Sequence, residues 1–229
     1  MSVEYHFRTR DEASAAAATR IAGLLDCALN AQSAASLVVS GGSTPVVCFE
    51  QLAHSDLEWE RVHVLMSDER WVAPTADSSN EKLVRSTLLT DAAAAARLLP
   101  VFQPEMSIET RCQMLDKEVD SIPQPFACTL LGMGEDGHFA SLFPDAANLE
   151  AGLDLDTQSS WLAIDTEASP LPRVSMTLAA LLRSREIVLL IFGENKRKVL
   201  DSARESIDRY PVSQLLAQQI TPVRIFWAP

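Results

Sequence analysis

A glycine-rich stretch, Gly132-Met133-Gly134-Glu135-Asp136-Gly137-His138, carries the residue types that could do chemistry in this chain. It follows an apolar run, Phe126 to Leu131, that is typical of a buried strand. Glycine permits a positive φ or a close approach to a ligand, and ligands of open α/β sheets bind beyond the carboxyl ends of the strands. Because histidine has an unperturbed pKa of about 6.5, which suits proton transfer near neutral pH, His138 is a candidate general base. The alternative is a turn in which Asp136 and His138 only cap backbone groups.

A second glycine turn, Ser40 to Pro45, lies between a β-branched strand expected at 35–40 and a helix expected at 46–52. Unpaired N–H groups and the helix dipole make such a turn an anion site. The turn has neither the GxxxxGK[ST] pattern of a nucleotide P-loop nor the GxGxxG pattern of a dinucleotide site, so a small phosphate ester is the expected ligand. The alternative is an ordinary capped helix start. The residues expected to hold the phosphate are Gly41, Gly42, Ser43 and Thr44.

Three further segments contribute charged side chains. Asp68-Glu69-Arg70 follows a strand expected at 62–66, and the guanidinium fork of Arg70 suits a phosphate or a carboxylate. Arg173 and Lys196 are expected at helix starts, where a cation opposes the helix dipole unless it serves a ligand. Each cation alone could be ordinary surface charge. Together they predict a phosphate site lined by Arg70, Arg173 and Lys196.

Composition narrows the class of protein. The chain has 229 residues, 47% of them hydrophobic, which suits one α/β domain spanning residues 1–229. The formal net charge of -12 argues against a nucleic-acid partner, because such proteins present a basic patch. No apolar run approaches the roughly 18 residues of a membrane span, and the N-terminus lacks the features of a signal peptide, so we expect a cytoplasmic protein without a membrane partner. The four cysteines form no CxxC pair, and we expect reduced thiols without a disulfide or a metal site. They are Cys27, Cys48, Cys112 and Cys128.

Apolar strands alternate with helices along the chain, which predicts a mostly parallel sheet covered on both faces. Strands are expected at 3–8, 35–40, 62–66, 98–102, 126–131, 186–192 and 223–227, with a further segment at 161–165. Helices are expected at 13–29, 46–52, 81–89, 108–119, 177–182, from about 195 to 206, and at 211–218, the first of them capped by Asp11.

The segments already described, in this order, resemble the motifs of 6-phosphogluconolactonases. The matching stretches are Ser40 to Pro45, Asp68-Glu69-Arg70, Gly132 to Pro144, Pro172 to Thr177, and Gly193 to Lys196. The resemblance covers residues 35 to 200 and implies a three-layer α/β/α, Rossmann-like fold shared with glucosamine-6-phosphate deaminase and ribose-5-phosphate isomerase. The deaminase resembles the chain through the same glycine loop, but carries a glutamate just before the closing proline. This sequence has Phe143 there, which is the lactonase form, while Arg197 departs from the small residue that often follows the lysine.

The resemblance implies a carboxylic ester hydrolase without a cofactor. Its substrate would be the sugar-phosphate lactone 6-phospho-D-glucono-1,5-lactone, hydrolysed to 6-phospho-D-gluconate in the second step of the oxidative pentose phosphate pathway. We expect His138 to be the base, with Asp136 or Asp68 orienting the imidazole or the sugar hydroxyls; the sequence does not choose between them. A monomer or a weak homodimer is expected. Two alternatives stay open: a sugar-phosphate sensor without turnover, and an unphosphorylated lactone as the true substrate.

Overall fold

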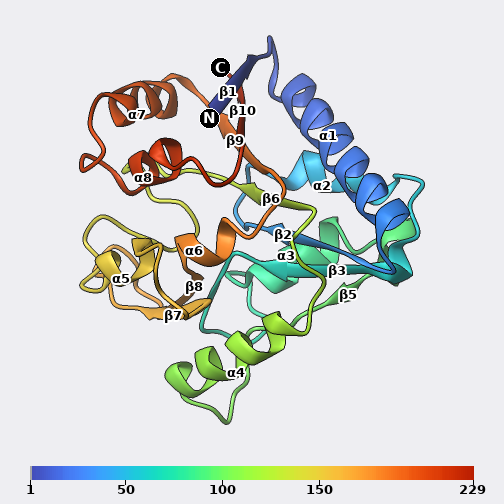
Figure 1. Ribbon diagram of the computed structural model, residues 1–229, viewed down its shortest axis with the longest axis horizontal. Coiled ribbons are helices and arrows are strands. Elements are labelled where there is room, and N and C mark those ends of the chain that lie inside the picture. Colours follow the sequence, from blue (N-terminus) through green and yellow to red (C-terminus); the bar gives the residue numbers. More distant parts are fainter. Residues whose placement is uncertain (1) are drawn as a thin grey trace.

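A seven-stranded parallel sheet forms the centre of the computed structural model, which describes residues 2–229 (Figure 1). The strand order is β1-β10-β9-β6-β2-β3-β5, and every neighbouring pair in it is parallel. The strands are β1 (Ser2–His6), β2 (Ala35–Val39), β3 (Val62–Met66), β5 (Arg97–Leu98), β6 (Cys128–Leu131), β9 (Ile187–Phe192) and β10 (Val223–Ala228). All residues of β2 and β6 are buried, as the apolar runs predict for a sheet covered on both faces.

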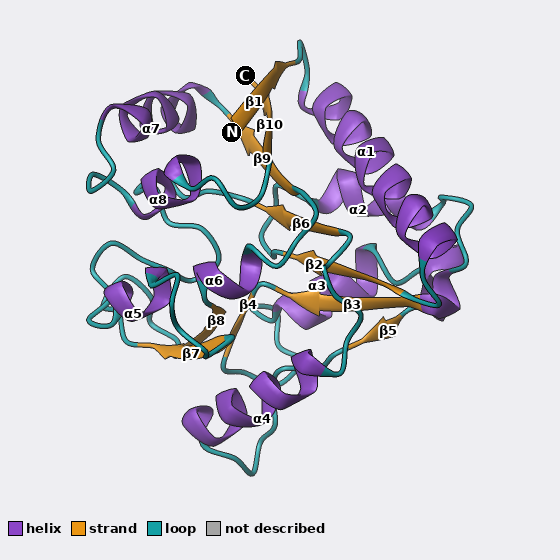
Figure 2. Ribbon diagram, viewed as in Figure 1, coloured by secondary structure: helices purple, strands orange, loops and turns teal. Residues whose placement is uncertain are grey.

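Helices cover both faces of this sheet, so the expected three-layer α/β/α architecture is confirmed (Figure 2). In the view of Figure 2, α1 and α2 lie on one side of the strands, and α7 and α8 lie on the other. The helices are α1 (Arg10–Ala31), α2 (Val46–Ala53), α3 (Asn80–Thr87), α4 (Ile108–Asp120), α5 (Leu149–Leu153), α6 (Leu178–Leu181), α7 (Glu194–Glu205) and α8 (Pro211–Ala217), with 3-10 turns at Trp59–Arg61 and Asp91–Ala95. No helix of residues 2–229 is both long enough and apolar enough to cross a bilayer.

The strand order reverses beside β6, and this reversal decides where a ligand can bind. From β2 the chain proceeds outward through β3 to β5, and from β6 it proceeds in the other direction through β9 to β10. Val39 of β2 pairs with both Met66 and Leu130, so the loops that follow β2, β3 and β6 leave the sheet at one edge. Such a switch point is the usual ligand site of an open α/β sheet.

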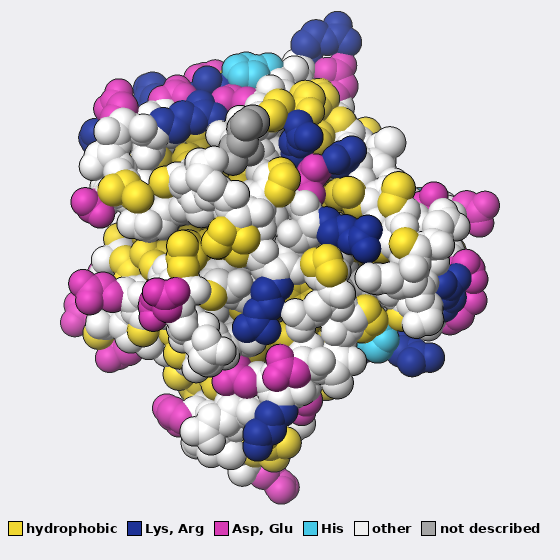
Figure 3. All heavy atoms as spheres, viewed as in Figure 1, with side chains coloured by type: hydrophobic (Ala, Val, Ile, Leu, Met, Phe, Trp, Pro, Cys, Tyr) yellow, Lys and Arg dark blue, Asp and Glu magenta, His cyan; other side chains and the backbone are white. Residues whose placement is uncertain are grey.

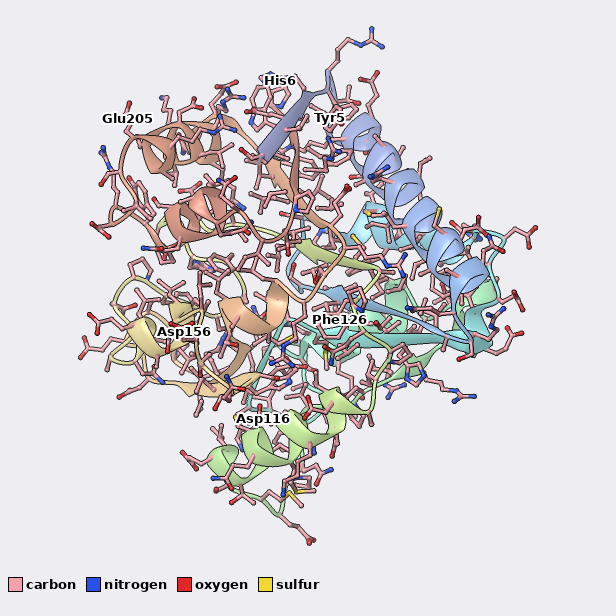
Figure 4. All side chains as sticks on the ribbon, viewed as in Figure 1. Tyr5, His6, Asp116, Phe126, Asp156 and Glu205 are labelled. Atoms are coloured by element: carbon pink, nitrogen blue, oxygen red, sulfur yellow. The ribbon has the colours of Figure 1, made fainter. Side chains whose placement is uncertain are left out.

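A second, three-stranded antiparallel sheet stands beside this edge and was not predicted. It consists of β4 (Asp68–Arg70), β8 (Arg173–Met176) and β7 (Trp161–Ile164) in the order β4-β8-β7. Asp116 of α4, labelled in Figure 4, accepts hydrogen bonds from the backbone N–H groups of Ser160 and Trp161 and so ties α4 to β7. The expectation that Arg173 lies at a helix start is wrong, because Arg173 pairs with Arg70 across two antiparallel strands.

Several element ends also differ from the prediction. Thr9, not Asp11, caps α1, since the Thr9 hydroxyl accepts from the backbone N–H of Glu12. The strand expected at 98–102 is only Arg97–Leu98, and β6 begins at Cys128 after a single bridge at Phe126. Phe126, labelled in Figure 4, is fully buried.

The cysteines divide into two groups. All four are free thiols, of which Cys48, Cys112 and Cys128 are buried while Cys27 is exposed on α1. Burial raises the pKa of Cys48 to about 12, so this thiol stays protonated and acts as an apolar core side chain.

Candidate active site

One pocket of about 260 Å³ opens at the carboxyl edge of the central sheet, over the switch point. It is lined by residues of the loops after β2 and β6, together with side chains of β4, α3, β8 and α7. The lining consists of Ser40, Gly41, Gly42, Ser43, Thr44, Asp68, Arg70, Asn80, Gly132, Met133, Gly134, His138, Phe139, Ala140, Arg173 and Lys196. All the residues predicted to be catalytic or to bind the phosphate, except Asp136, therefore line this pocket.

Asp136 and His138 form a hydrogen-bonded pair at the mouth of this pocket. Asp136 Oδ1 lies 2.6 Å from His138 Nδ1 and 3.2 Å from the backbone nitrogen of His138. Burial alone would raise the pKa of Asp136, but the hydrogen bond and the charge of His138 outweigh it and lower that pKa. Asp136 is thus an ionised acceptor at neutral pH, so Nδ1 carries the proton and Nε2 remains the basic nitrogen.

Gly134 is required where it stands because the imidazole lies directly on its Cα. A Cβ built on Gly134 would overlap Cε1 and Nδ1 of His138 and Oδ1 of Asp136. The loop is closed by a hydrogen bond from the Gly134 nitrogen to the His138 carbonyl, 2.8 Å long, and Gly137 adopts a φ of 78°. Val212 of α8 donates to the Gly137 carbonyl, which fixes the loop to the helical layer.

The turn after β2 has the features expected of an anion site. Gly42 has a φ of 87°, which a side chain would disfavour. Pro45, the residue before α2, makes no side-chain cap, so the start of this helix is not an ordinary capped one. Gly42 and Ser43 are exposed at the pocket, where their N–H groups and hydroxyl can meet a ligand.

Asp68 does not contact the imidazole within the described residues, but organises Arg173 instead. Its Oδ2 accepts from Ser141 Oγ at 2.6 Å and from Arg173 Nη2 at 3.1 Å, and Arg173 Nε donates to Ser141 Oγ at 2.9 Å. Asp68, Ser141 and Arg173 are all buried. Burial, and more weakly the charge of Arg70, lowers the pKa of Arg173 despite the opposing effect of Asp68. Ser141 stands in the glycine-loop segment, but its type and spacing gave no indication of this bridging position.

Arg70 and Asn80 come to the pocket through a buried carboxylate. Glu69 accepts from the backbone nitrogens of Arg70, Asn80 and Glu81, each at 2.7 Å, and so attaches the start of α3 to β4. Asn80 then donates from Nδ2 to the Asp68 carbonyl, and its side chain fills the space beside Gly41. Asn80 was not predicted as a site residue, because its position in the pocket follows only from this tertiary contact.

Lys196 reaches the pocket from the first turn of α7. Burial lowers its pKa, and the nearby charge of Glu135 opposes that effect. Arg197, the departure noted in the sequence, takes no part in the lining; it donates to Glu4 and Asp201. His6 lies on β1 at the border of the molecule, labelled in Figure 4.

The charge of the pocket is opposite to that of the chain. Among the described residues that line it, Arg70, Arg173 and Lys196 are cationic and Asp68 is the one carboxylate, while the chain carries a formal charge of -12. On the face shown in Figure 3, basic and acidic side chains are interspersed. A local cationic cluster beside a His–Asp pair is an arrangement that can bind an anionic small molecule and transfer a proton.

Comparisons with known proteins identify the class to which this fold and site belong. The family described as glucosamine-6-phosphate isomerases/6-phosphogluconolactonase matches residues 8–227. The chain is 37% identical to a 6-phosphogluconolactonase of Rhizobium meliloti, with 100% of both chains covered. It is 40% identical to one of Caulobacter vibrioides over 97% of this chain and 95% of that protein. A crystal structure of a 6-phosphogluconolactonase from Shewanella baltica superposes with a TM-score of 0.96 at 38% identity, covering 100% of this chain and 98% of that one. The chain belongs to the glucosamine-6-phosphate isomerase/6-phosphogluconolactonase family.

Proposed function

We propose that this chain hydrolyses 6-phospho-D-glucono-1,5-lactone to 6-phospho-D-gluconate with His138 as the general base. The observation that carries the mechanism is the 2.6 Å contact between Asp136 Oδ1 and His138 Nδ1 at the mouth of a cationic pocket. In the neutral imidazole this contact holds the proton at Nδ1, so the lone pair of Nε2 can accept a proton from water. The similarity of the chain to 6-phosphogluconolactonases supports this hydrolysis, which is the second step of the oxidative pentose phosphate pathway.

The reaction needs one water molecule and one proton carrier. Nε2 of His138 takes a proton from water as the water oxygen attacks the lactone carbonyl carbon. The resulting imidazolium is stabilised by Asp136, which holds the ring at Nδ1. When the carbonyl reforms, the bond to the ring oxygen breaks and that oxygen receives the proton from Nε2. The sugar acid then ionises, and the histidine is neutral again.

The phosphate is held apart from this chemistry. The turn from Gly41 to Thr44 offers backbone N–H groups and hydroxyls, and Lys196 supplies a cation on the same pocket wall. Arg70 and Arg173 add two guanidinium groups, with Arg173 fixed by Asp68 and Ser141. We therefore assign Asp68 to the positioning of Arg173, and Asp136 to the positioning of His138.

Phe143 supports a lactonase rather than a deaminase. Amino-sugar ring opening in the deaminase uses a glutamate at this place, and the buried phenyl ring here can neither donate nor accept a proton. The cysteines are free thiols, which fits a reducing compartment, and we propose the cytoplasm as the location and a monomer or weak homodimer as the state.

The test follows the decay of freshly generated 6-phosphogluconolactone, coupled to 6-phosphogluconate dehydrogenase, above its spontaneous hydrolysis. We expect rapid decay with the unaltered protein, and His138→Ala should lower kcat by about 10²–10⁴-fold. The variant should still bind 6-phosphogluconate, because the residues that we propose to bind the phosphate are unchanged. Decay at the background rate with both proteins would refute the lactonase proposal, and near-full activity of His138→Ala would refute the role of the base.

A further inference from the structure

We propose that Phe143 is a positioning residue for His138. This inference rests on the proposed function, since it concerns the base of that reaction. The rings of Phe143 and His138 have centroids 4.3 Å apart with an interplanar angle of 36°. Phe143 is 7% exposed and is not among the residues that line the pocket, whereas His138 is. The phenyl ring therefore supports the imidazole from the protein side and leaves the pocket side to the substrate.

The backbone between the two rings brings them together. Ala140 takes a left-handed φ of 49°, and the Leu142 nitrogen donates to the Phe139 carbonyl at 3.0 Å, which closes a tight turn. The Phe143 nitrogen then donates to the Ser141 carbonyl. A non-glycine residue in this conformation is costly and persists only where the surroundings impose it. The turn returns the chain so that Phe143 packs on His138, five residues earlier.

His138 needs such support because its other anchor is weak. The side chain of Asp136 is 43% exposed and that of His138 is 27% exposed, so water competes for their hydrogen bond. A single hydrogen bond at Nδ1 also leaves the ring free to swing about that contact. The phenyl ring restricts this rotation, and a displacement of about 1 Å at a reacting group can cost on the order of 10²-fold in rate.

The same phenyl ring lies under the cation of the pocket. The guanidinium carbon of Arg173 is 5.6 Å from the Phe143 centroid, within the range of a cation–π contact. Arg173 has two further anchors, Asp68 and Ser141, so it depends less on the ring than His138 does. Loss of the ring should therefore affect the chemical step more than the binding of the phosphate.

Phe143→Leu tests the proposal, because it keeps an apolar side chain but removes the ring. If this variant does not fold, Phe143→Met is the second choice, because methionine is flexible and fills irregular gaps. With 6-phosphogluconolactone we expect kcat to fall about 10- to 100-fold and KM to change less than threefold. Phe143→Tyr retains the ring and should retain most of kcat. In a His138→Ala background the Leu substitution should lower kcat less than threefold further, because residues that act through one group are not additive.

Two results would overturn the proposal: an unchanged kcat in a folded Phe143→Leu protein, or an equal loss with and without His138. A merely structural role of Phe143 gives the second result. A readout that does not depend on turnover is the Hε1 proton resonance of His138 in the NMR spectrum. The chain has four histidines, and the resonance that is missing in His138→Ala is the one that belongs to His138. The ring current of Phe143 should shift this resonance, the shift should disappear in Phe143→Leu, and its persistence would refute the contact. If the unaltered protein has no lactonase activity, the proposed function fails while this measurement still decides the positioning.

Discussion

Gly134 is the residue whose replacement tests the geometry of the site most directly. In Gly134→Ala, the new methyl group would occupy space held by Cε1 and Nδ1 of His138 and by Oδ1 of Asp136. The overlap is deep, so the imidazole has to retreat by on the order of 1 Å, and its hydrogen bond with Asp136 is distorted at the same time. A displacement of that size at a reacting group costs on the order of 10²-fold.

We therefore expect kcat/KM of Gly134→Ala to fall by about 10²-fold, but by no more than His138→Ala, which removes the base altogether. The fold should be little affected, because Gly134 does not have a positive φ and the atoms that must yield belong to half-exposed side chains. The assay is the coupled decay of fresh 6-phosphogluconolactone, with circular dichroism and a urea titration to show that the variant is folded.

Gly132→Ala is the matched control in the same loop. A Cβ on Gly132 meets no heavy atom within 4 Å and its φ is not positive, so this variant should lose less than tenfold in kcat/KM. Equal losses in the two variants would mean that any added methyl group in the loop is harmful. Near-full activity of Gly134→Ala would show that the imidazole does not lie on Gly134 during the reaction, and would refute the assignment of the base from this geometry.

Two other predictions concern binding and stability. Burial lowers the pKa of Lys196, so this side chain is charged below that pKa and loses its charge as the pH rises through it, at a lower pH than an exposed lysine does. The affinity for 6-phosphogluconate, measured by calorimetry, should therefore fall at alkaline pH. Lys196→Arg, which stays charged, should retain its affinity in the same measurement. Arg111 is fully buried and donates to the carbonyls of Pro100 and Val101 and to Glu118. In urea titrations, Arg111→Ala should lower the free energy of unfolding by about 2–4 kcal/mol, while kcat stays unchanged. A loss below about 0.5 kcal/mol, which is typical of a surface substitution, would contradict a stabilising role of Arg111.

Much of the site could be predicted from the sequence because strand ends fix where the loops go. Apolar runs located β2, β3, β6 and β9, and parallel strands place the loops after them at one edge. The pocket position of Ser43, His138 and Lys196 follows from that geometry alone. The partner of each charged group does not follow, because it depends on side-chain reach of a few ångströms between loops.

Asp68 and Arg173 show why the rest could not be predicted. Asp68 follows the end of β3 and Asp136 follows the end of β6, so either carboxylate could be expected to support His138. In the antiparallel pair of β4 and β8, Arg70 lies opposite Arg173 and Asp68 lies opposite Ser175. Alternate residues of a strand share a face, so Asp68 lies diagonally across from Arg173 on one face of this small sheet. Those strands have only three and four residues, and Pro170 and Pro172 precede β8, so neither has the length that a sequence pattern needs.

The division of the pocket explains how one scaffold can serve different reactions on sugar phosphates. The groups that we propose for phosphate binding lie in the turn after β2, in β4, in β8 and in α7, whereas the groups that we propose for proton transfer lie in the single loop after β6. The family to which the chain belongs is described by two activities, those of glucosamine-6-phosphate isomerases and 6-phosphogluconolactonase. A change confined to the loop after β6, such as the loss of the Asp136 carboxylate, can therefore alter the chemistry while the phosphate site stays intact. By this argument Asp136→Asn should lose lactonase turnover through kcat and keep its affinity for 6-phosphogluconate, whereas a parallel loss of affinity would show that the two halves of the pocket are not independent.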